Sequence, residues 1–337
     1  MGHGLKLEIA ALRIWSAAIL AALLCFVLSV SDGAAAEAYP TKPIKLVVAF
    51  APGGPADVMA RLIANAVSPT LGQAVYVENR PGAGGIVGAR AVAESVPDGY
   101  SLLLGNTANL VISPLLYKNA GYDPAKAFAP IINLGITPNI LITNIGSGLK
   151  SVQEVIDYAE KNPGKLNYSS AGIGTPLHLI GEMFKQRLGL VLVHVPYKSG
   201  GLATQAVMSN EVQICFDSAE AGLPVVENGS VRGLAVTSEK RIPQQPNLPT
   251  MIEAGVPDFV SVSFTGVAAP AATPLVIVEK LNAVIRQALE SDNVRAALDH
   301  MAVAPRIGSP GDFGTFLAGE RDRWSAVIKR AHIEMSE

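Results

Sequence analysis

The stretch Lys45-Leu-Val-Val-Ala-Phe50-Ala-Pro-Gly-Gly-Pro-Ala-Asp57 decides the fold of this chain. Its first six residues form a short apolar run bounded by Pro and Gly, which predicts a buried strand rather than a helix. The strand ends at Gly53-Gly54, and a helix is expected from Val58. Such a turn leaves backbone N–H groups unpaired at the start of the helix, where they and the helix dipole favour an anion. The stretch therefore predicts an anion-binding turn.

Two further glycine-rich turns repeat this pattern. Arg80-Pro-Gly-Ala-Gly-Gly-Ile-Val-Gly88 leads into a helix-like run, and we interpret it with the first turn as two walls of one anion pocket. In Ser170-Ala-Gly-Ile-Gly-Thr175-Pro176, Thr175 occupies the N-cap position and Pro176 the first helical position, so backbone donors and a hydroxyl face an open gap. The alternative is that each of these segments is an ordinary strand-to-helix turn or a plain cap.

Short β-rich runs alternate with helix-like segments along the rest of the chain, which favours α/β layers with mostly parallel sheets. The runs are 74–77, 101–104, 140–143, 166–170, 190–195, 212–216, 232–237 and 264–268. Residues 151–161 carry apolar positions on one helix face, and Ser151 with Glu154 has capping-box spacing. Long helices are expected at 274–290 and 313–330.

No motif for a cofactor, a metal or catalysis is complete. Val87 stands where the dinucleotide fingerprint needs its third glycine, so no cofactor is predicted. His178 and Glu182 share a helix face, but without a second nearby histidine they are better explained by packing and hydrogen bonding than by a metal site. Ser169, Ser170 and Thr175 lack a Gly-x-Ser-x-Gly elbow. We therefore predict that the protein is not an enzyme.

The first 38 residues have the pattern of a cleaved export signal. Lys6 and Arg13 precede an apolar run at 14–30, and small residues follow at cleavage spacing, which predicts cleavage after Ala36 or Ala38. The alternative is an uncleaved membrane anchor, because the run is close to membrane-spanning length. Removal of the signal leaves Cys215 as the sole cysteine, so no intramolecular disulfide can form. The formal net charge of −2 gives no sign of a nucleic-acid surface.

Several motifs in one order resemble the Bug family of periplasmic solute-binding proteins of tripartite tricarboxylate transporters. The motifs begin at Tyr39-Pro-Thr-Lys-Pro, continue through the glycine turns described above and Pro97-Asp-Gly-Tyr100, and recur in the later part of the chain as Asn162-Pro-Gly-Lys-Leu-Asn-Tyr-Ser-Ser, His194-Val-Pro-Tyr-Lys198 and Leu248-Pro-Thr-Met-Ile-Glu-Ala-Gly-Val-Pro257. The resemblance covers essentially the whole chain after the signal. Thr265 departs from it, because relatives often have an aromatic residue there, and Thr204-Gln205 replaces a position that is often acidic.

The resemblance implies an α/β, two-lobed type II periplasmic binding protein fold with the ligand cleft between the lobes. Lobe I would comprise residues 39–137 and 237–337, and lobe II residues 138–236. In the family, the two lobe I loops and one lobe II loop close on the ligand, with bridging waters carrying contacts of a carboxylate. By position these loops are 52–54, 83–85 and 174–175 of this chain.

Polar residues at strand ends complete the candidate site, because ligands of open α/β sheets bind at the carboxyl ends of strands. Asp217 could take an amino group or an amide, and Asn106 could bind a distal carboxylate, while the alternative for each is a turn residue. Asp57 is expected to cap its helix or to bond across to the 82–85 loop rather than to touch the ligand. The candidate ligand-binding residues are Phe50, Pro52, Gly53, Gly54, Asp57, Ala83, Gly84, Gly85, Asn106, Thr107, Ser170, Gly174, Thr175, His178, Asp217 and Ser218.

The function predicted from these features is a soluble, monomeric periplasmic receptor. It would close on a small carboxylate (a di- or tricarboxylate, an amino acid or an aromatic acid) and deliver it to an inner-membrane permease. Closure would follow from contacts that the ligand makes with both lobes only in the closed state. A ligand-dependent sensor subunit has the same sequence features, and an exported enzyme is the other alternative.

Overall fold

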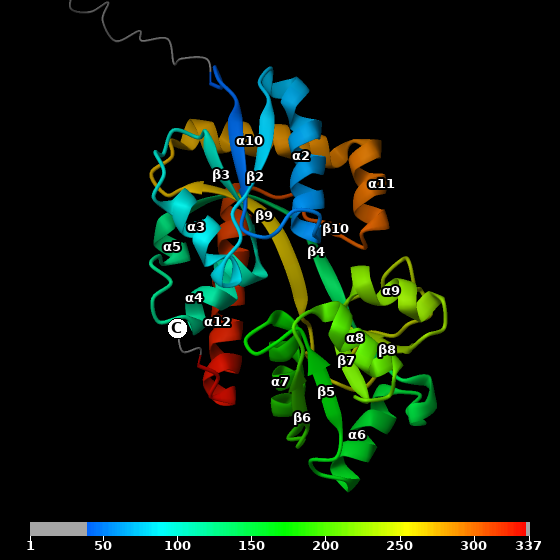
Figure 1. Ribbon diagram of the computed structural model, residues 1–337. Helices are drawn as coiled ribbons and strands as arrows, with labels where there is room; N and C mark the ends of the chain where they lie inside the picture. Colours follow the sequence, from blue (N-terminus) through cyan, green and yellow to red (C-terminus); the bar gives the residue numbers. More distant parts are fainter. Residues whose placement is uncertain (1–38, 335–337) are drawn as a thin grey trace, which may run out of the picture. The chain divides into compact units, whose positions relative to one another are not determined.

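The computed structural model describes residues 39–334. The predicted signal at 1–38 lies outside these residues. The described residues from Lys42 onward group as one compact unit. Within the described part, no helix combines the length and the apolar character needed to cross a membrane. Figure 1 shows strands and covering helices alternating along the chain, as the sequence pattern predicts.

Ten strands form one hydrogen-bonded sheet in the order β2-β1-β3-β9-β4-β7-β5-β6, with β8 and β10 both paired to β4. The strands are β1 Ile44–Val48, β2 Val75–Asn79, β3 Ser101–Asn106, β4 Phe128–Thr143, β5 Asn167–Ser170, β6 Val193–Pro196, β7 Ile214–Ser218, β8 Arg232–Val236, β9 Val262–Pro270 and β10 Ala304–Pro305. The α-helices are α2 Pro55–Leu71, α3 Ile86–Ala93, α4 Ser113–Leu116, α5 Pro124–Ala127, α6 Val152–Lys161, α7 Pro176–Leu188, α8 Gly200–Met208, α9 Ala219–Glu227, α10 Leu275–Glu290, α11 Asp292–His300 and α12 Pro310–Ala331.

The sheet contains two parallel sets joined by antiparallel strands. In the first set β1 pairs in parallel with β2 and β3, and in the second β5 pairs in parallel with β6 and β7. β4 and β9 pair with their neighbours in antiparallel fashion, so the prediction of mostly parallel sheets is wrong for these strands. The two strands run in opposite directions because β4 carries the chain from the first set to the second, and β9 carries it back (Figure 1).

The pairing of β4 changes partner within the strand. Phe128–Pro138 pairs with β9, and this two-stranded segment is named the β4–β9 ribbon below. Asn139–Thr143 pairs instead with β7 and β8. After β8, Phe259 still packs against Phe184 and Phe216 of the second set, which favours a return to the first set near Val262. The two-lobe division itself stays a proposal.

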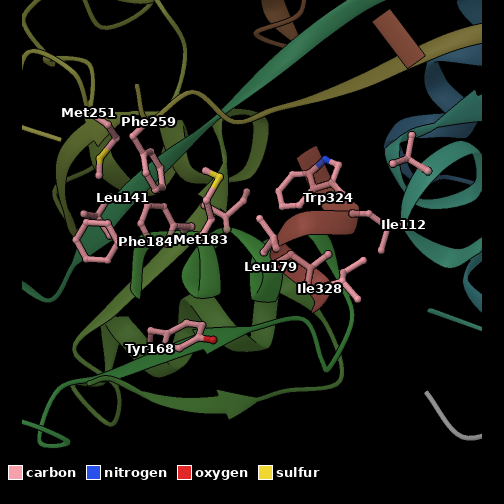
Figure 2. Close-up of a cluster of buried hydrophobic side chains, with 14 of the residues drawn as sticks. Ile112, Leu141, Tyr168, Leu179, Met183, Phe184, Met251, Phe259, Trp324 and Ile328 are labelled. Carbon is pink, nitrogen blue, oxygen red and sulfur yellow. The ribbon is translucent and has the colours of Figure 1, made fainter. Parts of the chain in front are cut away.

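The core is built from the apolar faces that the sequence pattern predicts. In α6, Val152, Val155, Ile156 and Ala159 are buried and Ser151 accepts from the Glu154 N–H. Figure 2 shows Trp324 and Ile328 of α12 beside Leu179 and Met183 of α7, with Phe184 and Phe259 further along the same cluster. The buried indole N–H of Trp324 donates to Glu320 Oε2 at 3.1 Å. The two parallel sets therefore share one continuous hydrophobic cluster.

Candidate ligand-binding site

A cavity of about 260 Å³ lies at the N-termini of α2, α7 and α9. The first set contributes Phe50 after β1, the start of α2 and the residues after β3, while the second set contributes the start of α7 and the start of α9. The carboxyl ends of β3 and β7 meet it, which is where ligands bind in open α/β sheets. The lining residues are Phe50, Pro55, Ala56, Met59, Asn106, Thr107, Ala108, Thr137, Pro176, Ser218, Glu220, Ser263, Phe264, Thr265, Met301 and Val303.

The N-terminus of α2 opens onto this cavity. Gly54 is its N-cap, and no described side chain caps the helix. Pro55 has no N–H, so the free donors of the first turn begin at Ala56, which lines the cavity. A helix of 17 residues carries a full macrodipole, whose positive end is directed at the cavity. The helix start that follows the predicted glycine turn is therefore part of the cavity wall, whereas Gly53 and Gly54 themselves are not.

The side chain of Asp57 stabilises this turn through hydrogen bonds. Its carboxylate is 4% exposed and accepts hydrogen bonds from Gly53 N at 3.0 Å, Arg61 Nε at 2.9 Å and Asn79 Nδ2 at 3.0 Å. The hydrogen bonds from Arg61 and Gly53 lower the pKa of Asp57 to about 2. Asn79 Nδ2 also donates to Phe50 O, so one network joins the turn to the ends of β1 and β2.

The expected bond from Asp57 to the 82–85 loop is not formed among the described residues. The first turn of α2 faces the end of β2, where Asn79 stands, while the loop packs elsewhere. Gly84 O accepts from the Ser113 hydroxyl at 2.9 Å, and a Cβ at Gly85 would lie 3.1 Å from Phe50 Cζ. Ala83, Gly84 and Gly85 do not line the cavity, although Gly85 packs against Phe50, which does. Pro52, Gly53 and Gly54 do not line it either, because the wall at this point begins with Pro55 and Ala56.

The 170–175 turn is built from its own hydrogen bonds. Thr175 caps α7, and its hydroxyl donates to Gly172 O at 2.7 Å. Gly174 N donates to His178 Nδ1 at 3.1 Å, which fixes that ring nitrogen as an acceptor. Of the predicted residues here, Ser170, Gly174, Thr175 and His178 do not line the cavity, and the turn reaches it only through Pro176.

Two histidines stack behind this turn. The rings of His178 and His194 lie 3.9 Å apart, and Tyr168 stacks on His194 at 4.9 Å. Ser170 Oγ contacts His194 Nε2 at 2.6 Å, while Glu182 accepts from Tyr168 and Lys185. Burial and then the charge of His178 lower the pKa of His194 to about 4, and burial lowers the pKa of His178. Among residues 39–334, no group of His, Cys, Asp or Glu could hold a metal ion.

We expect the stability of this region to fall as the pH falls from about 6.5 towards 4. The unfolded histidine takes up a proton near its usual pKa of 6.5, whereas folded His194 resists protonation down to about 4. Protonation therefore favours the unfolded chain throughout this window, and the contribution is fully present above it. Urea denaturation at a series of pH values should show a shallower dependence for His194→Gln than for the wild type. His300→Gln, at an exposed position, is the control, and equal slopes for all three proteins would contradict the assignment.

Of the four polar residues predicted at strand ends, Asn106, Thr107 and Ser218 line the cavity and Asp217 does not. Asn106 Oδ1 accepts from the N–H groups of Ala108 and Asn109, which leaves its Nδ2 as a donor at the cavity. Thr107 lines the cavity, and its hydroxyl accepts from Phe264 N at 2.9 Å. Ser218 lines the cavity and caps α9. Asp217 is 2% exposed, and its carboxylate accepts hydrogen bonds from Thr204 Oγ1 and Ser218 N. These bonds are made within the protein, so the carboxylate does not face a ligand.

Several lining residues were missed from the sequence. Long-range strand pairing brings Thr137 and Ser263 to the cavity, and the loop before β10 brings Met301 and Val303. No local motif indicates either placement. Glu220 could have been found, because it follows two residues after the strand-end Ser218 in the first turn of a helix. Thr265 lines the cavity and was noted as a departure from the family pattern.

A second cavity of about 830 Å³ is also lined in part by the β4–β9 ribbon. Thr137 and its partner Ser263 contribute to the first cavity, whereas the next pair, Pro138 and Val262, contributes to the second. The pair Ile136 and Phe264 is divided between the cavities, and Val303 lines both, so the two cavities are neighbours along the ribbon.

Comparison with known proteins identifies the family. Residues 59–333 match the family model described as TctC, the tripartite tricarboxylate transporter family receptor. The chain belongs to this family. Its members are binding proteins rather than enzymes, and the match confirms the resemblance to the Bug family. The solved structures of relatives confirm the α/β periplasmic binding protein fold.

Solved structures and curated relatives of this TctC-family receptor agree with the match. BugT from Bordetella pertussis is 35% identical over 295 residues, covering 87% of this chain and 90% of BugT. The R. palustris protein Rpa4515 with adipate superposes with a TM-score of 0.77 at 36% identity, over 88% of this chain and 99% of that one. MatC from Rhodopseudomonas palustris with bound malate gives 0.73 at 32% identity, over 86% and 100%. The periplasmic binding protein BugD gives 0.74 at 34% identity, over 88% and 100%.

Proposed function

We propose that this TctC-family receptor binds a small carboxylate in the 260 Å³ cavity and delivers it to a membrane permease. The observation that carries the proposal is the uncapped N-terminus of α2 opening onto a cavity that an amide donor and several hydroxyls also line. The relatives solved with adipate and malate support the ligand class. Export to the periplasm through the signal at 1–38 and action as a monomer belong to the same proposal.

Lobe closure is the mechanism we propose for capture. Pro176, Ser218 and Glu220 come from the second parallel set, while most other lining residues come from the first. A ligand that contacts both sets only when they approach shifts the population towards the closed form. Backbone donors and bridging waters suffice for micromolar affinity, about −8 kcal/mol, without an arginine clamp.

The test is a thermal-shift screen of the chain from Tyr39 onward against carboxylic acids and their uncharged amides. A ligand at about 100 times its Kd adds about 2.7 kcal/mol, which for about 300 residues raises Tm by roughly 4 °C. Acids should raise Tm, and their amides should not. Equal shifts by acids and amides would contradict the carboxylate assignment.

Ala56→Asp provides the matching variant. The new carboxylate stands in the first turn of α2, where the dipole stabilises it and preserves the fold, but it takes the place of the ligand's anion. We expect Tm without ligand to be maintained and the shift by acids to disappear, whereas the uncharged Ala56→Asn retains part of it. Full binding by Ala56→Asp would place the ligand away from α2.

A further inference from the structure

One charged side chain lines the cavity, and it has the wrong sign for an anion. Glu220 is the sole ionisable residue among those that line it, and no described lysine, arginine or histidine joins it there. Glu220 stands in the first turn of α9, after the N-cap Ser218. It is partly buried, and no described residue donates a hydrogen bond to it or pairs with it. A half-buried carboxylate without a partner at a binding cavity calls for a ligand that supplies one.

The two parallel sets therefore present opposite electrostatic features to the cavity. The first set contributes the free N–H groups of α2 and Nδ2 of Asn106, all donors. The second contributes the Glu220 carboxylate, and the buried Asp217, three residues earlier in the chain, is a second carboxylate bonded only to Thr204 and Ser218. Burial raises the pKa of Glu220, as expected for a carboxylate that lacks a cation. A ligand with a carboxylate at each end would place one of them against Glu220, where like charges repel.

We infer that the ligand is a zwitterionic amino carboxylate, whose carboxylate binds at the start of α2 and whose ammonium group pairs with Glu220. The inference rests on the proposed function and narrows it to one ligand class. The charge of Glu220 distinguishes amino acids from diacids of the same length, because the ammonium gains a charge-assisted bond where a second carboxylate meets repulsion.

The probes are three matched series of acids, compared by calorimetry and thermal shift. Each series has carbon chains of two to six atoms and carries an ammonium, a hydroxyl or a second carboxylate in place of the same terminal group, and the common α-amino acids complete the panel. In the wild type, the best amino acid should bind at least tenfold more tightly than the hydroxy acid and the diacid of the same length.

Variants of α9 identify the group responsible. Glu220→Gln should lose tenfold or more affinity for the amino acid while its affinity for the hydroxy acid stays unchanged, and Glu220→Lys should bind the diacid instead. Glu227→Gln, an exposed position on the same helix outside the cavity, is the control and should match the wild type. A wild type that prefers diacids, or an amino acid preference unaffected by Glu220→Gln, overturns the inference while leaving carboxylate binding intact. Binding of no acid at all would instead overturn the proposed function, and this inference with it.

Discussion

Asp57→Ala should abolish measurable carboxylate binding and lower the free energy of unfolding by about 3 kcal/mol. The change removes a buried carboxylate that accepts three hydrogen bonds, from Gly53 N, Arg61 Nε and Asn79 Nδ2, and each such bond contributes about 1 kcal/mol. It also releases the turn that positions the start of α2 at the cavity. Urea denaturation measures the stability, and calorimetry with the best acid measures the binding.

The pH dependence provides an independent check of Asp57. The pKa of Asp57 is about 2 in the folded chain against 3.8 ordinarily, so its stabilising contribution is present above about pH 4 and is lost as the pH falls towards 2. The difference between the wild type and Asp57→Ala should narrow over that window. Asp292→Ala, at an exposed position in the first turn of α11, is the matched control and should cost well under 1 kcal/mol. An equal loss in both variants would show that Asp57 acts only through the helix dipole.

Gly88→Ala should cost about 3 kcal/mol or more and yield little folded protein. A Cβ at Gly88 would lie 2.8 Å from Ala49 Cα, from Ala49 Cβ and from Arg80 O, where α3 crosses the end of β1. Because these are backbone or directly attached atoms, no side-chain rotation relieves the overlap, and α3 must move away from the strand. Expression yield and Tm measure the effect.

The same substitution in α12 should act in the opposite direction. A Cβ at Gly319 would have no heavy atom within 4 Å, so Gly319→Ala should stabilise the helix by about 0.5–1 kcal/mol. The pair separates packing from backbone entropy. A Gly88→Ala protein with the Tm of the wild type would mean that α3 does not lie against β1 as described.

Local sequence predicted the elements well, and long-range geometry explains what it missed. The run at 140–143 was recognised as a strand, but it is the last quarter of β4, whose earlier residues include Pro130 and Pro138 and lack a clear alternation. The antiparallel course of β4 and β9 depends on where the chain crosses between sets, and a list of strands does not contain that information. α11 was missed because its mean hydropathy is low and its apolar residues are few.

The candidate site also contains residues that local sequence predicts and residues that only long-range packing determines. The α2 turn, Asn106, Thr107 and Ser218 could be found because a strand end followed by a helix start is written in consecutive residues. The 83–85 and 170–175 turns have the same local pattern, yet one supports Phe50 and the other is closed by His178. Whether a turn lines a cavity or supports it is decided by the segment that packs against it, which for the 83–85 turn includes Ser113, 29 residues further along the chain.

The β4–β9 ribbon lines both cavities, so ligand affinity depends on more than the smaller one. If capture of a ligand moves the ribbon so that apolar side chains of the larger cavity, such as Ile136 and Phe316, become exposed to water, that exposure opposes binding. Each 100 Å² so exposed costs about 2.5 kcal/mol, which is subtracted from the binding energy. Substitutions in the larger cavity can therefore change the affinity of this receptor without touching the ligand. They would leave unchanged which ligand the receptor selects.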